Sequence, residues 1–222
     1  MASQARVAFD ENVLDVKALI DIHKEKGAQS RGRRYGLEVL NKSAIVLITA
    51  FWESYCEDIA AEGLDHIVKH APNADSLPPE LKKIIVRQLN NNDNQLAIWN
   101  LADDGWRTVL KQQLTDLQEA RNRKLNTPKS EKIDELFLST LGIKQISTCW
   151  KWDKTSATKA SNHLDRFVTL RGAIAHRGKS GKSIKKRQVD DYFSLVKRLA
   201  AKTGGNVNAH VKLVTGRPLW TR

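Results

Sequence analysis

The stretch LRGAIAHRGKS, residues 170–180, places an arginine and a histidine on either side of four small or apolar residues. Apolar residues recur through and before it every three or four positions, as on one side of an amphipathic helix. They are Leu164, Phe167, Val168, Leu170, Ile174 and Ala175. Gly178 follows where a helix would stop. The pattern predicts a helix over about residues 156–177, with Arg171 and His176 in its last two turns.

The same helical period runs through most of the chain. The other expected helices cover about residues 7–27, 35–69, 81–89, 106–126, 128–141 and 189–199. In the first of them, the residues expected to face the core are Val7, Leu14, Ala18 and Ile22. The segment VNAHVKLV, residues 207–214, alternates and also fits a short strand. The sequence therefore predicts an all-α bundle of about six or seven helices, to which a short C-terminal strand could be added.

The positive charge of the chain is concentrated near its C-terminal end. The net charge is +12, and residues 177–222 hold 12 Lys and Arg against 2 Asp. Such an excess favours an anionic partner, such as a nucleic acid. A chain of 222 residues can bury a real core. We expect a single domain over residues 1–222, with a core over about 35–202 and a basic extension over 203–222.

The cysteines and the apolar segments indicate where the protein works. Cys56 and Cys149 are isolated, which suits a reducing compartment and makes a disulfide framework improbable. Acidic residues from Asp10 to Asp15 occupy the place of the apolar run of a signal peptide. The longest apolar segment, residues 44–52, is too short to span a membrane. We expect a cytoplasmic protein without membrane contact.

Two Gly-Lys-Ser triplets, at Gly178 and Gly181, invite a comparison with the phosphate-binding loop of nucleotide-binding proteins. That motif needs four residues between its first glycine and Gly-Lys-Ser, and it follows a strand. Here Gly172 is separated from Gly178 by five residues, and a helix precedes the loop. The sequence therefore argues against this reading.

Metal-binding and carboxylate patterns are weak. His66 and His70 share a helix face, but the residues between them do not form the HExxH motif. The acidic pairs, such as Asp190-Asp191, are adjacent in sequence and diverge on a helix. Neither cysteine lies in a recognisable catalytic motif. No metal site and no cofactor are predicted.

Arg171 and His176 together offer the chemistry that RNA cleavage needs. A histidine transfers protons near neutral pH, and an arginine stays charged and presents a planar donor fork to phosphate. Their separation of five residues places them roughly 140° apart on an ideal helix. Convergence requires a helix end that unwinds, the reach of arginine, or a second copy of the chain. From the spacing alone, a merely basic helix end remains the competing interpretation.

The segment Arg171-Gly-Ala-Ile-Ala-His176 matches the Arg-x(4–6)-His signature of HEPN domains, which are all-α modules that include many metal-independent endoribonucleases. More of the chain resembles the RiboL-PSP type of HEPN domain, in the same order along residues 35–180. The matching features are residues 51–55 (FWESY), residues 125–128 (LNTP), Gly142-Ile143, Trp150 and residues 170–178. The ordered set is more specific than the signature alone.

The resemblance implies an RNase site with Arg171 and His176 as the catalytic pair, formed at the interface of a homodimer. It also suggests supporting roles for Glu53, Trp52 and Asn126. Glu53 could orient Arg171 or His176 by an ion pair, Trp52 fits a core position, and Asn126 fits a helix cap. Family members often have a polar residue directly after the arginine, whereas this chain has Gly172.

The predicted function is a metal-independent endoribonuclease of toxin–antitoxin or phage-defence type. The basic residues expected to guide the RNA are Arg177, Lys179, Lys182, Lys185, Lys186 and Arg187. Trp152, between Lys151 and Lys154, could stack on a base. The alternative is a non-catalytic HEPN module that binds RNA or a protein partner, such as an antitoxin, through its basic tail.

Overall fold

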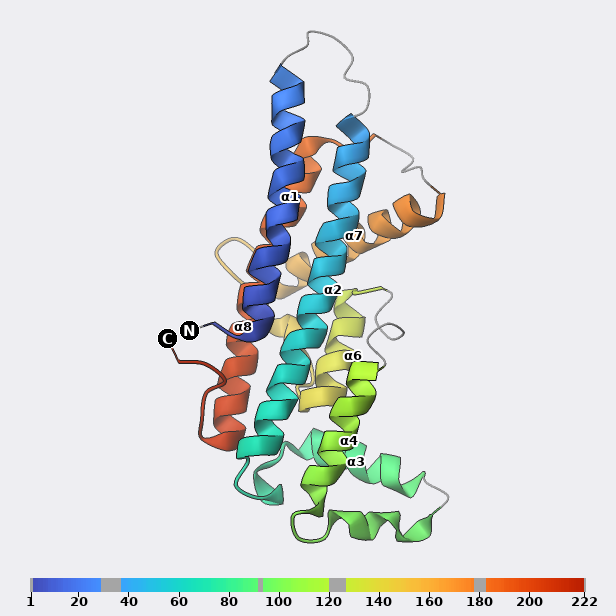
Figure 1. The fold of residues 1–222 in the computed structure, drawn as a ribbon, viewed down its shortest axis with the longest axis vertical. Coiled ribbons are helices and arrows are strands. Elements are labelled where there is room, and N and C mark those ends of the chain that lie inside the picture. The colour runs from blue at the N-terminus through green and yellow to red at the C-terminus, as the bar shows by residue number, and fades with distance from the viewer. Residues whose placement is uncertain (1, 29–36, 92–93, 120–126, 178–182, 222) are drawn as a thin grey trace.

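A computed structural model of the protein describes residues 2–28, 37–91, 94–119, 127–177 and 183–221. Within these ranges, the side chains of residues 26–28, 95, 117–118 and 176–177 are outside the description. The elements are α1 (Gln4–Ala28), α2 (Leu37–His70), η1 (Ala74–Ser76), α3 (Pro79–Asn90), η2 (Gln95–Leu101), α4 (Gly105–Glu119), α6 (Ser130–Leu141), η3 (Ile146–Cys149), α7 (Ala157–Arg177) and α8 (Lys186–Thr215). The described ranges contain no strand, and the predicted all-α bundle is confirmed (Figure 1).

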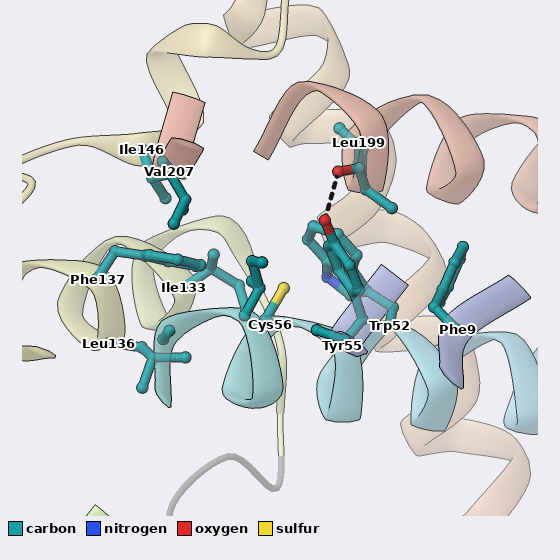
Figure 2. Packing of buried hydrophobic residues seen from close by; sticks show 14 of the residues in the cluster. Phe9, Trp52, Tyr55, Cys56, Ile133, Leu136, Phe137, Ile146, Leu199 and Val207 are labelled. Carbon is teal, nitrogen blue, oxygen red and sulfur yellow. Dashed lines mark hydrogen bonds between the residues drawn. The ribbon is translucent and has the colours of Figure 1, made fainter. Parts of the chain in front are cut away.

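Helix α2 forms the centre of the bundle. It packs against α1, α4, α6, α7 and α8 (Figure 1). Its side chains Trp52, Tyr55 and Cys56 are buried among residues of α1, α6 and α8, including Phe9, Phe137 and Val207 (Figure 2). A helix that is apolar on most of its sides is stable only when it is covered in this way. The long apolar segment at residues 44–52 is therefore a core helix, and no helix within the described ranges has the length and apolar content to cross a membrane.

The prediction of which face of α1 lines the core is wrong. Val7, Leu14 and Ile22 are exposed, and so is Ala18. The buried residues of α1 are instead Ala5, Phe9, Val13, Val16 and His23. The helix carries two apolar stripes, and helical spacing alone does not tell which one is covered. Phe9 decides the choice, because its ring packs against Tyr55 of α2 at a centroid distance of 5.2 Å.

The expected C-terminal strand is also wrong. The segment at residues 207–214 belongs to α8, which continues to Thr215. Val207, Val211 and Val214 are buried at spacings of four and three, so the helical period explains the segment better than alternation does. Gly216 ends the helix with φ = 74°, in the left-handed region that favours glycine. The expected boundary near residue 202 falls inside α8, and the division into core and extension stays a prediction.

One contact joins α4 to the end of α2, and another joins α6 to the start of α3. Arg107 of α4 donates to the carbonyl oxygens of Val68 and Ala71, at 2.6 and 2.7 Å, and so caps the C-terminal end of α2. Gly142 ends α6 with φ = 73°, directly after the helix expected over residues 128–141. A Cβ atom at Gly142 would lie 2.8 Å from the Cβ of Pro78, so both its conformation and this close approach require glycine.

Candidate functional site

Helix α7 carries both residues of the Arg-x4-His motif. Its backbone stays helical through Arg177, so the helix does not unwind between Arg171 and His176. The two residues therefore leave the axis roughly 140° apart. An unwound helix end before Gly178 therefore does not bring the two residues together. Two other ways remain: the long side chain of arginine could span the gap, or a second copy of the chain could supply the partner residue.

Arg171 lies where α7 packs against α2 and α8. The residue is half-buried, and its Nε atom is shielded from solvent. Its charge interacts with Glu53 of α2 and with Tyr192 of α8, because it opposes the burial-raised pKa values of both groups. The predicted partner Glu53 therefore lies within electrostatic range of Arg171, and so does Tyr192. In Figure 1, the three helices that supply these residues lie against one another.

Glu53 titrates close to neutral pH. Burial raises the pKa of its carboxyl group from 4.5 to about 7, and the positive charge of Arg171 partly opposes this rise. The carboxyl group can thus change its charge near physiological pH while it faces a guanidinium group that stays charged. Such a pair is found both at structural sites and at functional sites.

Tyr192 was not predicted as a site residue. Its side chain is fully buried, and its ring stacks on Phe167 of α7 at a centroid distance of 4.2 Å. The Thr49 hydroxyl donates to the carbonyl of Ile45, so the Tyr192 hydroxyl donates to Thr49 Oγ1 at 2.9 Å. Tyr192 therefore joins all three helices beside Arg171. In the sequence, Tyr192 occupies an ordinary core position of an amphipathic helix, and no motif identifies it as a site residue.

The tryptophans near the site divide into core and surface residues. Trp52 is fully buried, as expected, with its ring in an edge-on contact with Trp150 at 5.8 Å. Trp150 is also fully buried and donates from Nε1 to Thr203 Oγ1 at 2.9 Å. Neither ring can stack on a base. Trp152 is half-buried and lies under the guanidinium group of Arg198.

The structure covers only part of the predicted RNA-guiding segment. Lys179, Lys182 and Asn126 lie outside the described residues, and so do the side chains of His176 and Arg177. Lys185 is exposed at the start of α8.

The next two cations of this segment face carboxylates one turn further along α8. Lys186 forms a salt bridge with Asp190 at 2.7 Å, and Arg187 lies 3.9 Å from Asp191. Their charges are therefore partly neutralised.

Three smaller features bear on the chemistry. Within the described part of the chain, no group of three or more His, Cys, Asp or Glu side chains is placed to hold a metal ion. His66 and His70 lie with their rings 4.4 Å apart, and burial, followed by the charge of His70, lowers the pKa of His66. At Gly172, an added Cβ would meet nothing within 4 Å, so the fold does not require glycine there.

Comparison with known proteins identifies the fold. The family model described as RiboL-PSP-HEPN matches residues 10–204, a range that begins inside α1 and ends inside α8. No curated protein and no solved structure matches the chain. The match spans nearly the whole helical bundle, including Glu53 and the Arg-x4-His motif, and it supports an RNase-type or RNA-related module. The resemblance drawn from the sequence is confirmed, and the chain belongs to the RiboL-PSP-HEPN family.

Proposed function

We propose that this protein is an endoribonuclease that cleaves RNA with Arg171 and His176 and needs no metal ion. The observation that carries the proposal is the setting of Arg171, half-buried between α2 and α8 beside Glu53. An arginine on an exposed helix end would be a general basic residue. Here its position is fixed by three helices, as a group that must meet one phosphate should be.

In the proposed reaction, the 2′-oxygen of a ribose attacks the adjacent phosphorus, and the bond from phosphorus to the 5′-oxygen breaks. His176 transfers protons, because the 2′-hydroxyl must lose one and the 5′-oxygen must gain one. Arg171 holds the phosphoryl oxygens, on which negative charge increases in the transition state. The products carry 2′,3′-cyclic phosphate and 5′-hydroxyl ends.

Glu53 is assigned as a positioning residue. Its carboxylate form orients the guanidinium group of Arg171 across the contact between α2 and α7. Burial strengthens this interaction compared with the same pair in water. Because the pKa of Glu53 is about 7, the oriented state becomes more populated as the pH rises through neutrality.

The active unit is proposed to be a homodimer. On a continuous α7, positions 171 and 176 lie roughly 140° apart around the helix axis, which favours a second copy over arginine reach as the way to bring the two groups together. A twofold axis beside α7 would set Arg171 of one copy near His176 of the partner subunit. Gly172, at which a Cβ would meet nothing, and the half-buried Ala173 leave room for close approach of that partner.

A nuclease of this kind fits a toxin–antitoxin or phage-defence system, in which an antitoxin or another protein partner restrains cleavage. A cytoplasmic location is proposed on the same grounds. The principal rival is a HEPN module that binds RNA, or a protein partner, without cutting.

The test is cleavage of labelled structured RNA in EDTA by the wild type and by His176→Ala. We expect cleavage by the wild type alone, with cyclic-phosphate ends. RNA binding by both proteins without cleavage would favour the non-catalytic module. Equal cleavage by both proteins would remove His176 from the reaction.

A further inference from the structure

The described cations differ in whether they have a carboxylate partner. Ten of them lie within 4.0 Å of a carboxylate, usually three or four residues away on the same helix: Arg6, Lys24, Lys42, Lys69, Lys83, Arg107, Lys132, Lys144, Lys186 and Arg187. Many other exposed cations of the described ranges form no salt bridge with a described residue. Four of these are distinguished by their place: Lys151 and Lys154 lie in the turn after η3, and Arg198 and Lys202 lie on α8, which packs against η3. We call these four residues the turn patch.

The turn patch is grouped around the turn at Trp152 and the part of α8 that packs against η3. Trp152 and Thr155 exchange backbone hydrogen bonds of 3.1 and 2.9 Å, which closes a tight turn just before α7. The guanidinium group of Arg198 lies 5.6 Å from the centre of the Trp152 ring. Lys202 reaches η3 one turn further along α8, where its charge opposes the burial-raised pKa of the Cys149 thiol.

Holding these charges together costs the folded protein free energy. Arg198 and Lys202 are like charges at i and i+4, which destabilises a helix by a few tenths of a kcal/mol. Lys154 has φ = 60°, a conformation that glycine would adopt at lower cost. Asp153 in the same turn and Asp134, which accepts hydrogen bonds from Ser147 of η3, supply two negative charges near the four cations. An anionic ligand would offset the repulsion.

We propose that the turn patch is a second RNA-binding site, which contacts phosphates of the strand away from the cleaved bond. Helix α7 begins two residues after the turn and carries Arg171 fourteen residues further on. At 1.5 Å per residue, the two sites lie roughly 20 Å apart along the helix, or about six stacked nucleotides. One strand can therefore reach both.

The chemistry of the turn patch favours binding without sequence preference. Trp152 is half-buried, and Arg198 covers one face of its ring, so the ring supports the guanidinium group there. Four cations that contact phosphates release bound counterions, which gives strong salt dependence and no reading of base edges. The inference rests on the proposed function in one respect, namely that the ligand is RNA.

The test compares two charge-matched variants in the His176→Ala background, which binds RNA without cutting it. The patch variant combines Lys151→Gln, Lys154→Gly, Arg198→Gln and Lys202→Gln. The change to glycine at residue 154 also relieves the left-handed conformation. The control variant carries Gln at four cations of α1, α3 and α4, namely Lys17, Lys83, Arg87 and Lys111. Affinity for a labelled 20-nucleotide RNA is measured by fluorescence anisotropy over a range of salt concentrations.

We expect the patch variant to bind at least about tenfold more weakly at low salt, with its salt slope reduced by about three, since each phosphate contact contributes about 0.7 for a single strand. The control should change little. An unchanged slope in the patch variant, an equal loss in both variants, or no RNA binding by the His176→Ala parent would overturn the inference. A wild type that binds through the patch but never cuts would sink the nuclease and leave the patch standing.

Discussion

Arg171 of α7 and Arg198 of α8 belong to the same helical bundle, but they differ in burial and in the groups around them. Arg171 is half-buried, faces a carboxyl group and a tyrosine, and lies where α2, α7 and α8 join. Arg198 is exposed, covers the face of Trp152 and has no carboxylate partner among the described residues. On the proposals above, the exact position of the guanidinium group matters most at Arg171, whereas its positive charge matters most at Arg198. The site around Arg171 is suited to one reactive phosphate, and the turn patch is suited to a strand of phosphates.

The largest expected difference between Arg171 and Arg198 is in their response to replacement by lysine. Arg171→Lys keeps the charge but loses the planar donor fork, so we expect kcat/KM for RNA cleavage to fall by at least about a hundredfold. Arg198→Lys should change it by less than about threefold, because a phosphate contact on an exposed surface needs mainly charge. Equal effects of the two substitutions would remove the distinction between them. Thermal unfolding of both variants checks that the fold is retained.

Glu53→Gln tests whether the polar group beside Arg171 acts by position. Loss of the carboxylate should lower kcat/KM between about tenfold and about a hundredfold, since a small misplacement of a catalytic group has effects of this size. In the wild type, activity should rise with ionisation of Glu53 near pH 7. That part of the pH profile should disappear in Glu53→Gln. A uniform loss with an unchanged profile would indicate a structural role only.

The same carboxyl group predicts a pH effect on stability. The folded protein holds this proton up to about pH 7, whereas an unfolded chain releases it near 4.5. The contribution of Glu53 to the free energy of unfolding therefore falls as the pH rises between these values. Urea unfolding at about pH 5 and about pH 8 should show the wild type losing stability relative to Glu53→Gln. A gain would contradict the raised pKa.

A pair of tyrosines provides a smaller and more specific test. Tyr192→Phe removes the hydrogen bond to Thr49, and Tyr55→Phe removes the hydrogen bond from Tyr55 to the carbonyl of Ala200 at 2.8 Å. Each substitution should cost about 1 kcal/mol of unfolding free energy. Only Tyr192→Phe should also lower kcat, because only Tyr192 lies beside Arg171. If both substitutions lowered kcat to a similar extent, the loss of activity would come from general destabilisation of α8 and not from the place of Tyr192 beside Arg171.

The smallest expected effect concerns the start of α8. Lys186 and Arg187 carry charge that Asp190 and Asp191 partly neutralise. Replacing both aspartates by asparagine should release these cations and strengthen RNA binding about two- to fourfold at low salt, since such pairs are each worth a few tenths of a kcal/mol. Unchanged affinity would place this part of α8 outside the RNA path.

Much of this arrangement could be predicted from the sequence, and the failures have physical reasons. The helical period predicted α2 and α7. The helix expected over residues 128–141 also ends where α6 ends, before Gly142. Periodicity failed for α1 because that helix has two apolar stripes. It failed at residues 207–214 because buried valines at spacings of four and three also alternate with polar neighbours.

The site itself was only partly visible in the sequence. The motif marked Arg171 and the family resemblance suggested Glu53, but Tyr192 was missed, because its place beside Arg171 depends on how three helices pack and local spacing carries no such information. The pairing of charges was not visible in the sequence for a related reason. Lys186 and Arg187 of the predicted RNA-guiding segment face aspartates one turn away, and their role in RNA binding stays a prediction. Arg198 and Lys202 are distant in sequence from the turn at residues 151–154, and only the fold brings Arg198 over Trp152 and Lys202 near Cys149.

The most direct measurement mixes two inactive proteins. Arg171→Ala and His176→Ala subunits are co-expressed with different tags, purified through both tags, and assayed on labelled RNA in EDTA. If Arg171 and His176 of the partner subunit form one site, the mixed dimer regains cleavage to a substantial fraction of the wild-type rate, with cyclic-phosphate ends, while each variant alone stays inactive. A mixed dimer as inactive as its parents would contradict the shared site.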